Sequence, residues 1–223
     1  MGAVTQPVSS SYSSGKYYDE VYNRNVSLKV SSKWFLNYYI SVKGVCSDFE
    51  KDKTRSIIEI GSGHGGFIKL LNDKGFNNVV ASDINSSIYR GCGLQNRYYK
   101  LDILKPLPLE EKFDVVIAFD VFEHIDNMGK AAVNIYELLN SGGRVLFSVP
   151  FPSTKHLYDR FHTNMQLPHY YTNIFNSLGF KLDGVCTMSF TPVLWRFGCA
   201  LPLKLNIESR VFITEVFFNF RKL

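Results

Sequence analysis

A glycine-rich stretch preceded by a carboxylate is the part of this sequence best suited to chemistry. Glu59 lies two residues before the first of three alternating glycines, Gly61, Gly63 and Gly65. This spacing lets the backbone turn tightly and bring N–H groups against a ligand that no side chain could approach as closely. Apolar residues on both sides predict a strand before the loop and a helix after it, so the positive N-terminus of that helix would face the same ligand.

Two ligands fit such a loop, and the carboxylate separates them. Gly61, Gly63 and Gly66 also satisfy G-x-G-x-x-G, the dinucleotide fingerprint, which alone is a weak signal. Glu59 would repel a pyrophosphate, whereas its charge is favourable beside a ligand that carries an ammonium and a sulfonium. The run from Glu59 to Gly65 resembles the E/D-x-G-x-G-x-G signature of class I S-adenosylmethionine-dependent methyltransferases. The resemblance covers about residues 53–223 and implies S-adenosylmethionine as cofactor and S-adenosylhomocysteine as product.

Acidic residues follow the next strands at positions that suit the same cofactor. Asp83 ends a β-rich run at about the spacing at which a carboxylate meets ribose hydroxyls in a βαβ unit. By the resemblance, Asp102 accepts a hydrogen bond from the adenine amino group, and Ile103 packs on the ring. The predicted cofactor contacts are completed by Tyr18, Ile84, Phe119 and Asp120.

The order of strands and helices predicts how these residues are positioned. The predicted strands cover 57–60, 79–84, 98–101, 113–119, 144–150, 180–188 and 211–220, and the predicted helices begin near Phe67 or span about 130–140 and 169–179. Alternating strands and helices favour a parallel sheet, whose ligands lie outside the carboxyl ends of the strands. With the resemblance, the prediction is an α/β fold with an open, mostly parallel seven-stranded Rossmann-like sheet, helices on both faces, a C-terminal antiparallel hairpin and an N-terminal helical cap.

Length and composition predict one domain. The chain has 223 residues with 45% hydrophobic content, enough for one core. We expect disorder over 1–15, the cap over 16–52 and the cofactor-binding core over 53–223. No apolar run is long enough to span a membrane. The four cysteines are far apart and are typical of reduced packing cysteines, which predicts a cytoplasmic protein.

The aromatic cap has two interpretations. Its residues either close over the cofactor and acceptor as a lid, or pack an amphipathic helix on the core. Tyr18 is the better lid candidate, whereas Trp34 and Tyr38 suit either interpretation.

Histidines are the leading candidates for acceptor chemistry, because their ordinary pKa lies near neutral pH. His124 follows the fourth strand and is the first candidate for a base, and His169 is the second. An alternative uses Asp120, Glu123 and His124 as metal ligands on one face of a helix, in a pattern similar to the E-x-x-E-H motif of some RNA and ubiquinone-pathway methyltransferases. We predict no metal, because Asp120 departs from that motif.

The methyl acceptor is the least determined part of the prediction. We expect transfer to oxygen or nitrogen of a small or medium-sized metabolite. The net charge of +5 is dispersed, and the motifs of DNA base methylation are missing, so nucleic acid is disfavoured, with RNA left open. A protein that binds the cofactor without turnover stays an alternative, and a dinucleotide oxidoreductase is a more distant one. Oligomeric state is open.

Overall fold

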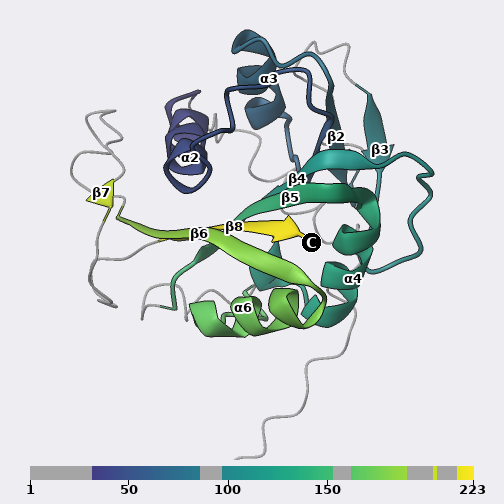
Figure 1. Cartoon of the computed structure of the whole chain (residues 1–223), viewed down its shortest axis with the longest axis vertical. Coiled ribbons are helices and arrows are strands. Elements are labelled where there is room, and N and C mark those ends of the chain that lie inside the picture. Colours follow the sequence, from purple (N-terminus) through teal and green to yellow (C-terminus); the bar gives the residue numbers. More distant parts are fainter. Residues whose placement is uncertain (1–31, 86–96, 153–161, 190–202, 205–214) are drawn as a thin grey trace, which may run out of the picture.

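The computed structural model describes residues 32–85, 97–152, 162–189, 203–204 and 215–223 (Figure 1). Its helices are α2 (Ser32–Val45), α3 (Gly66–Asp73), η3 (Phe122–His124, a 3-10 helix), α4 (Met128–Leu138) and α6 (Pro168–Ser177). Its strands are β1 (Ile57–Ile60), β2 (Val79–Asp83), β3 (Tyr98–Lys100), β4 (Phe113–Phe119), β5 (Leu139–Pro150), β6 (Phe180–Ser189), β7 (Leu203–Lys204) and β8 (Glu215–Lys222). Tyr18 and the stretch predicted to be disordered lie outside the described residues.

The strands form one mixed sheet in the order β3-β2-β1-β4-β5-β8-β6-β7. Strands β1 to β5 are parallel to one another. Strand β8 is inserted between β5 and β6 and runs antiparallel to both, as the predicted C-terminal hairpin requires. The open, mostly parallel Rossmann-like sheet is therefore confirmed, and the two-residue β7 adds an edge to the seven expected strands.

Helices cover both faces of the sheet, as predicted. In Figure 1, α2 and α3 lie on one side of the strands, and α4 and α6 lie on the other. The residues of β1 and β2 are all buried, which explains why these strands are apolar without alternation. No helix in the described part of the chain is long and apolar enough to cross a membrane.

The junction between α4 and β5 differs from the prediction. We expected a helix over 130–140 that Gly142 and Gly143 end. The helix instead begins at Met128, because the Asn127 side chain accepts a hydrogen bond from the backbone N–H of Lys130 at 3.0 Å. It ends at Leu138, because Leu139 already pairs with Phe113 at the start of β5, before an irregularity in the register.

The end of α2 is attached to the antiparallel part of the sheet by close backbone approach. The side-chain amide of Asn219 on β8 donates to the carbonyl of Val45 at 3.0 Å. Gly184 on β6 lies directly against the same carbonyl, and a Cβ at Gly184 would be 2.5 Å from that oxygen. Strand β6 has a register irregularity between Leu182 and Gly184, which brings the glycine to this position. The end of α2 can therefore lie this close to β6 because Gly184 has no side chain.

We expect Gly184→Ala to lower the free energy of unfolding by about 1–3 kcal/mol, because the added methyl group overlaps backbone that cannot move alone. Urea denaturation followed by circular dichroism measures the change. The control is Gly44→Ala in α2, where a Cβ meets nothing within 4 Å, and which should be neutral or stabilise by up to about 1 kcal/mol. Equal effects of the two substitutions would contradict the proposed contact.

Candidate functional site

A cavity opens at the carboxyl ends of the parallel strands, where the sheet topology places ligands in this class of fold. It is lined by Ile60, Gly61, Asp83, Ile84, Leu101, Asp102, Ile103, Leu104, Asp120, Val121, His124 and Ile125. Seven of these are residues singled out from the sequence: Gly61, Asp83, Ile84, Asp102, Ile103, Asp120 and His124. The structure thus brings together side chains that follow β1, β2, β3 and β4.

The glycine loop lies beside the cavity, which Gly61 lines, and is fixed to β2. Gly61, Gly63 and Gly65 have φ values of 72°, 51° and 73°, in the left-handed region that glycine adopts without strain. The backbone N–H of Gly63 donates to the Asp83 carboxylate at 2.9 Å, and that of Ser62 donates to the β2 carbonyl of Ser82 at 2.9 Å. Helix α3 begins directly after this loop, at Gly66.

Asp83 is a buried carboxylate that organises backbone. Its oxygens accept from the N–H groups of Gly63 and Asn85, both at 2.9 Å. Burial raises the pKa of Asp83, although these backbone hydrogen bonds partly oppose the shift. Because its side chain also lines the cavity, Asp83 can both hold the loop and accept hydrogen bonds from a ligand.

Glu59 lies beneath the loop instead of lining the cavity. Its side chain is buried, and Oε2 has no hydrogen-bond donor among the described residues. Burial first, and repulsion from Asp83 second, raise the pKa of Glu59 well above its usual range. A cation in the neighbouring cavity would favour its ionised form.

The segment after β3 forms the opposite wall. The Asp102 carboxylate accepts from the N–H of Leu104 at 3.0 Å, and the Ile103 side chain is buried. The Asn134 side chain of α4 donates to the carbonyls of Ile103 and Lys105 at 2.5 and 3.1 Å, which fixes this segment against the helix. Sequence reasoning missed Asn134, because a helical Asn gives no signal of such a distant contact.

Asp120 adopts an uncommon backbone conformation at the end of β4. Its φ is 52°, a positive value found in no other described non-glycine residue. Its carboxylate accepts hydrogen bonds from the Tyr38 hydroxyl of α2 and from the Ser148 hydroxyl of β5, the second at 2.9 Å. Phe119 stacks on the Tyr38 ring with centroids 4.7 Å apart, so it belongs to the core and does not line the cavity. Tyr38 and Ser148 were not identified as site residues from the sequence.

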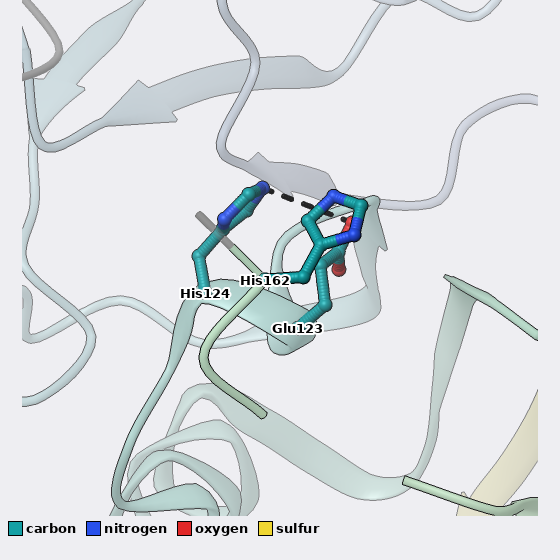
Figure 2. Close-up of side chains that lie close together, drawn as sticks. All are labelled: Glu123, His124 and His162. Carbon is teal, nitrogen blue, oxygen red and sulfur yellow. Dashed lines mark ion pairs between the residues drawn. The ribbon is translucent and has the colours of Figure 1, made fainter. Parts of the chain in front are cut away.

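Next to the cavity lies a cluster of one carboxylate and two imidazoles, Glu123, His124 and His162, of which His124 lines the cavity (Figure 2). The alternative metal set from the sequence placed Asp120 with Glu123 and His124 on a helical face. The structure instead forms a short 3-10 helix at 122–124 and groups His162 with the other two. His162 lies far along the chain from η3, and no local spacing pointed to it.

Asn164 holds the two parts of this cluster together. Its backbone N–H donates to the carbonyl of Glu123 at 2.8 Å, and its side chain donates to the carbonyl of Ile125 at 2.9 Å. The Tyr171 hydroxyl of α6 donates to the Asn164 carbonyl at 3.2 Å. His169, the second catalytic candidate, is exposed in the first turn of α6 and does not line the cavity.

The charges of the cavity favour a cationic ligand. Asp83, Asp102 and Asp120 supply carboxylates, and no Lys or Arg is present among the described residues that line it. Apolar side chains next to Asp102 suit an aromatic ring, and carboxylates suit ribose hydroxyls and an ammonium group. These residues fit S-adenosylmethionine, whereas the three carboxylates would repel the pyrophosphate of a dinucleotide.

Comparisons with known proteins agree with this geometry. Residues 41–183 match a family described as "Methyltransferase domain". In sequence, the chain is 28% identical over 130 residues to an uncharacterized protein of Haemophilus influenzae, covering 53% of this chain and 51% of that protein. It is also 28% identical over 162 residues to the lovastatin diketide synthase of Aspergillus terreus, covering 66% of this chain and 6% of the synthase. The chain thus spans about half or less of the curated relatives it matches.

The fold is shared with solved structures. A SAM-dependent methyltransferase from Archaeoglobus fulgidus is similar with a TM-score of 0.65 at 18% identity, covering 92% of this chain and 100% of that chain. The likeness confirms the predicted Rossmann-like architecture at a sequence identity too low to transfer a substrate.

The buried Glu59 predicts a defined dependence of stability on pH. Its pKa is raised in the folded state, so above the ordinary glutamate value the unfolded chain loses the proton while the folded chain still holds it. This group therefore destabilises the fold progressively as pH rises from about 4.5 toward its folded pKa. The Glu59→Gln variant lacks this titrating group. Its free energy of unfolding, relative to that of the natural protein, should therefore increase by up to about 1.4 kcal/mol per pH unit.

Urea denaturation at several values from pH 5 to pH 8 measures this difference. Glu111→Gln is the matched control, because Glu111 pairs with Arg97 at 2.9 Å and its pKa is lowered, chiefly by hydrogen bonds from Tyr99 and Arg97 that outweigh its burial. The difference in free energy of unfolding between Glu111→Gln and the natural protein should stay constant from pH 5 to pH 8. A constant offset for Glu59→Gln as well would show that Glu59 is ionised in the folded protein.

Proposed function

The chain belongs to the methyltransferase-domain family, and we propose that it transfers the methyl group of S-adenosylmethionine to an oxygen or nitrogen of a small or medium-sized metabolite. The observation that carries this proposal is a cavity at the carboxyl ends of the strands whose lining charges are all carboxylates, with His124 among the lining residues. Carboxylates favour the ammonium and sulfonium of the cofactor, and an imidazole on the same cavity can act on the acceptor.

The chemistry of the lining residues suggests how they would hold the cofactor. Asp83 would accept hydrogen bonds from the ribose hydroxyls, and Asp102 would accept one from the adenine amino group. Ile84 and Ile103 would pack against the adenine ring, and the glycine loop and Asp120 would bind the methionine part. Glu59 acts from beneath the loop, where its ionised form is favoured by a cationic ligand.

The bound cofactor supplies an activated methyl group on a good leaving group, so positioning of the acceptor can lower much of the barrier. An acceptor that arrives protonated must also lose its proton. His124 can take this proton as a general base, because an imidazole ordinarily titrates near neutral pH. The neighbouring Glu123 carboxylate lies 3.8 Å from His124 Nε2 and would stabilise the imidazolium that results.

Calorimetric titration with S-adenosylmethionine, S-adenosylhomocysteine and NADH tests the cofactor. We expect binding of the first two and none of NADH. Binding of NADH alone would overturn the proposal, and binding of the first two without methyl transfer to any acceptor would favour a protein that binds without turnover.

Asp83→Ala should weaken binding of S-adenosylmethionine by about 1–3 kcal/mol, because ribose hydrogen bonds to a charged group are lost. Asp83→Asn separates this loss from damage to the loop, since it keeps one carbonyl oxygen for the Gly63 N–H. The control is Asp73→Ala, which removes an exposed carboxylate of α3 that pairs with Lys69. Unchanged affinity in both Asp83 variants would mean that another residue binds the ribose.

His124→Ala should lower the rate of methyl transfer by about 10²–10⁴-fold while leaving affinity for S-adenosylmethionine within a few-fold. The measurement is transfer of labelled methyl to an acceptor found by screening hydroxyl and amine compounds. His169→Ala is compared in parallel, because the exposed His169 should be dispensable. A large loss in His169→Ala with full activity in His124→Ala would assign the acceptor chemistry to His169.

A further inference from the structure

The cluster of Glu123, His124 and His162 contains a second imidazole, which a single catalytic histidine does not need (Figure 2). Their ligand atoms, one from each residue, all lie within 4.8 Å of one another. The ring centroids of His124 and His162 are 5.2 Å apart, and Nε2 of His124 is 3.8 Å from the Glu123 carboxylate. Two imidazoles and one carboxylate at these distances form a recurrent ligand set for divalent transition metals.

We propose that Glu123, His124 and His162 bind a divalent transition metal ion of the zinc class, and that this ion activates an acceptor hydroxyl for methyl transfer. The inference rests on the proposed methyltransferase function and deepens it, because it assigns the acceptor to hydroxyl compounds. It also gives His124 a different role from a free base, since the nitrogen lone pair that would take a proton is used to bind the ion.

The geometry needs only a small adjustment to hold an ion. Bonds from zinc to imidazole nitrogen or carboxylate oxygen are about 2.0–2.2 Å, so two ligand atoms of one ion lie no more than about 4.4 Å apart. The observed limit of 4.8 Å exceeds this by a few tenths of an ångström, which side-chain rotation can supply. Asn164 anchors the backbone of the His162 segment to η3, so the two parts of the site are already held side by side.

The surroundings of the cluster also favour a cation. The Glu123 side chain is 2% exposed, and a buried carboxylate attracts a cation more strongly than an exposed one because water screens its charge less. Glu215 at the start of β8 is buried as well and interacts with Asp120 and Glu123, so three acidic side chains lie close together beside the cluster. A divalent ion would offset the negative charge that they can carry.

The position of the site connects it with methyl transfer. His124 belongs both to the cluster and to the lining of the cofactor cavity, so an ion held there borders that cavity. Coordination of the acceptor hydroxyl to the ion lowers its pKa, and its proton is released to water. The oxygen lone pair then forms the new O–C bond, the C–S bond breaks, and its electron pair returns to sulfur to give S-adenosylhomocysteine.

Metal binding can be measured without knowing the acceptor. The full chain, treated with chelator and then dialysed, is titrated with Zn²⁺ in competition with a chromophoric indicator, and Co²⁺ is used as a spectroscopic probe of the same site. We expect one equivalent of each ion to bind, and an excess of Mg²⁺ not to displace them, because Mg²⁺ prefers oxygen ligands. Failure to bind a stoichiometric amount of either ion would overturn the proposal.

Variants assign the site. His162→Ala and His162→Gln should each weaken Zn²⁺ binding about tenfold or more, as should Glu123→Gln and His124→Ala. His169→Ala is the control for metal affinity, because it removes a histidine outside the cluster. If Glu123→Gln does not fold, the two variants of the partly exposed His162 still decide the outcome, with circular dichroism to verify their folding. Unchanged affinity in both would place the ion elsewhere and overturn the proposal.

Calorimetry with S-adenosylmethionine separates failure of this inference from failure of the proposed function. A chain that binds S-adenosylmethionine and transfers methyl groups equally well with and without chelator keeps the function and loses the metal. A chain that binds the ion at this cluster but not S-adenosylmethionine keeps the metal site and loses the function. Loss of transfer to hydroxyl acceptors on chelation, restored by Zn²⁺ or Co²⁺, supports both.

Discussion

The hydrogen bonds to the Asp120 carboxylate join three parts of the structure that must meet for the cavity to exist. Tyr38 donates from α2 and Ser148 donates from β5, while Asp120 itself ends β4. Its positive φ costs about 1–2 kcal/mol for a residue other than glycine, and such strain persists only where the surroundings determine the conformation. The turn that it makes sends the chain away from the sheet into η3, and so places His124 on the cavity. The position of His124 thus depends on contacts from a helix and a strand that contribute no residue to the cluster of Glu123, His124 and His162.

Burial of negative charge is the second constraint, and it acts on both ends of the site. Burial raises the pKa of Glu59 beneath the glycine loop and of Asp83 beside it. At the other end, burial together with the charges of Asp120 and Glu123 raises the pKa of Glu215. Keeping several carboxylates this close is unfavourable unless some hold protons or a cation lies among them. A cationic cofactor would offset the negative charge of Glu59 and Asp83 at the glycine loop. This explains why a glycine loop that also fits the dinucleotide pattern is accompanied here by acidic residues.

Local patterns made most of the fold and one side of the site predictable. The parallel strands are apolar runs that end in acids, and the loop from Glu59 to Gly65 has a spacing that few other structures require. Contacts between distant segments were not predictable in the same way. The hydrogen bonds of Asn164 hold the His162 segment beside η3, and Tyr38 reaches Asp120 from a helix 82 residues earlier in the chain. The end of α4 was misplaced for a related reason, because pairing of Leu139 with Phe113 ended the helix before the glycines did.

The arrangement around His124 distinguishes two ways of activating an acceptor. A catalytic base needs one imidazole and one group that orients it, and Glu123 beside His124 is sufficient for that. Such a pair does not require a second imidazole at a ring distance of 5.2 Å. The same neighbour is an advantage when both rings bind a metal, because each stays neutral and donates a lone pair. His162 is therefore the residue that favours a metal ion over a free base. Asn164 holds the His162 segment in this position through its hydrogen bonds to the carbonyls of Glu123 and Ile125.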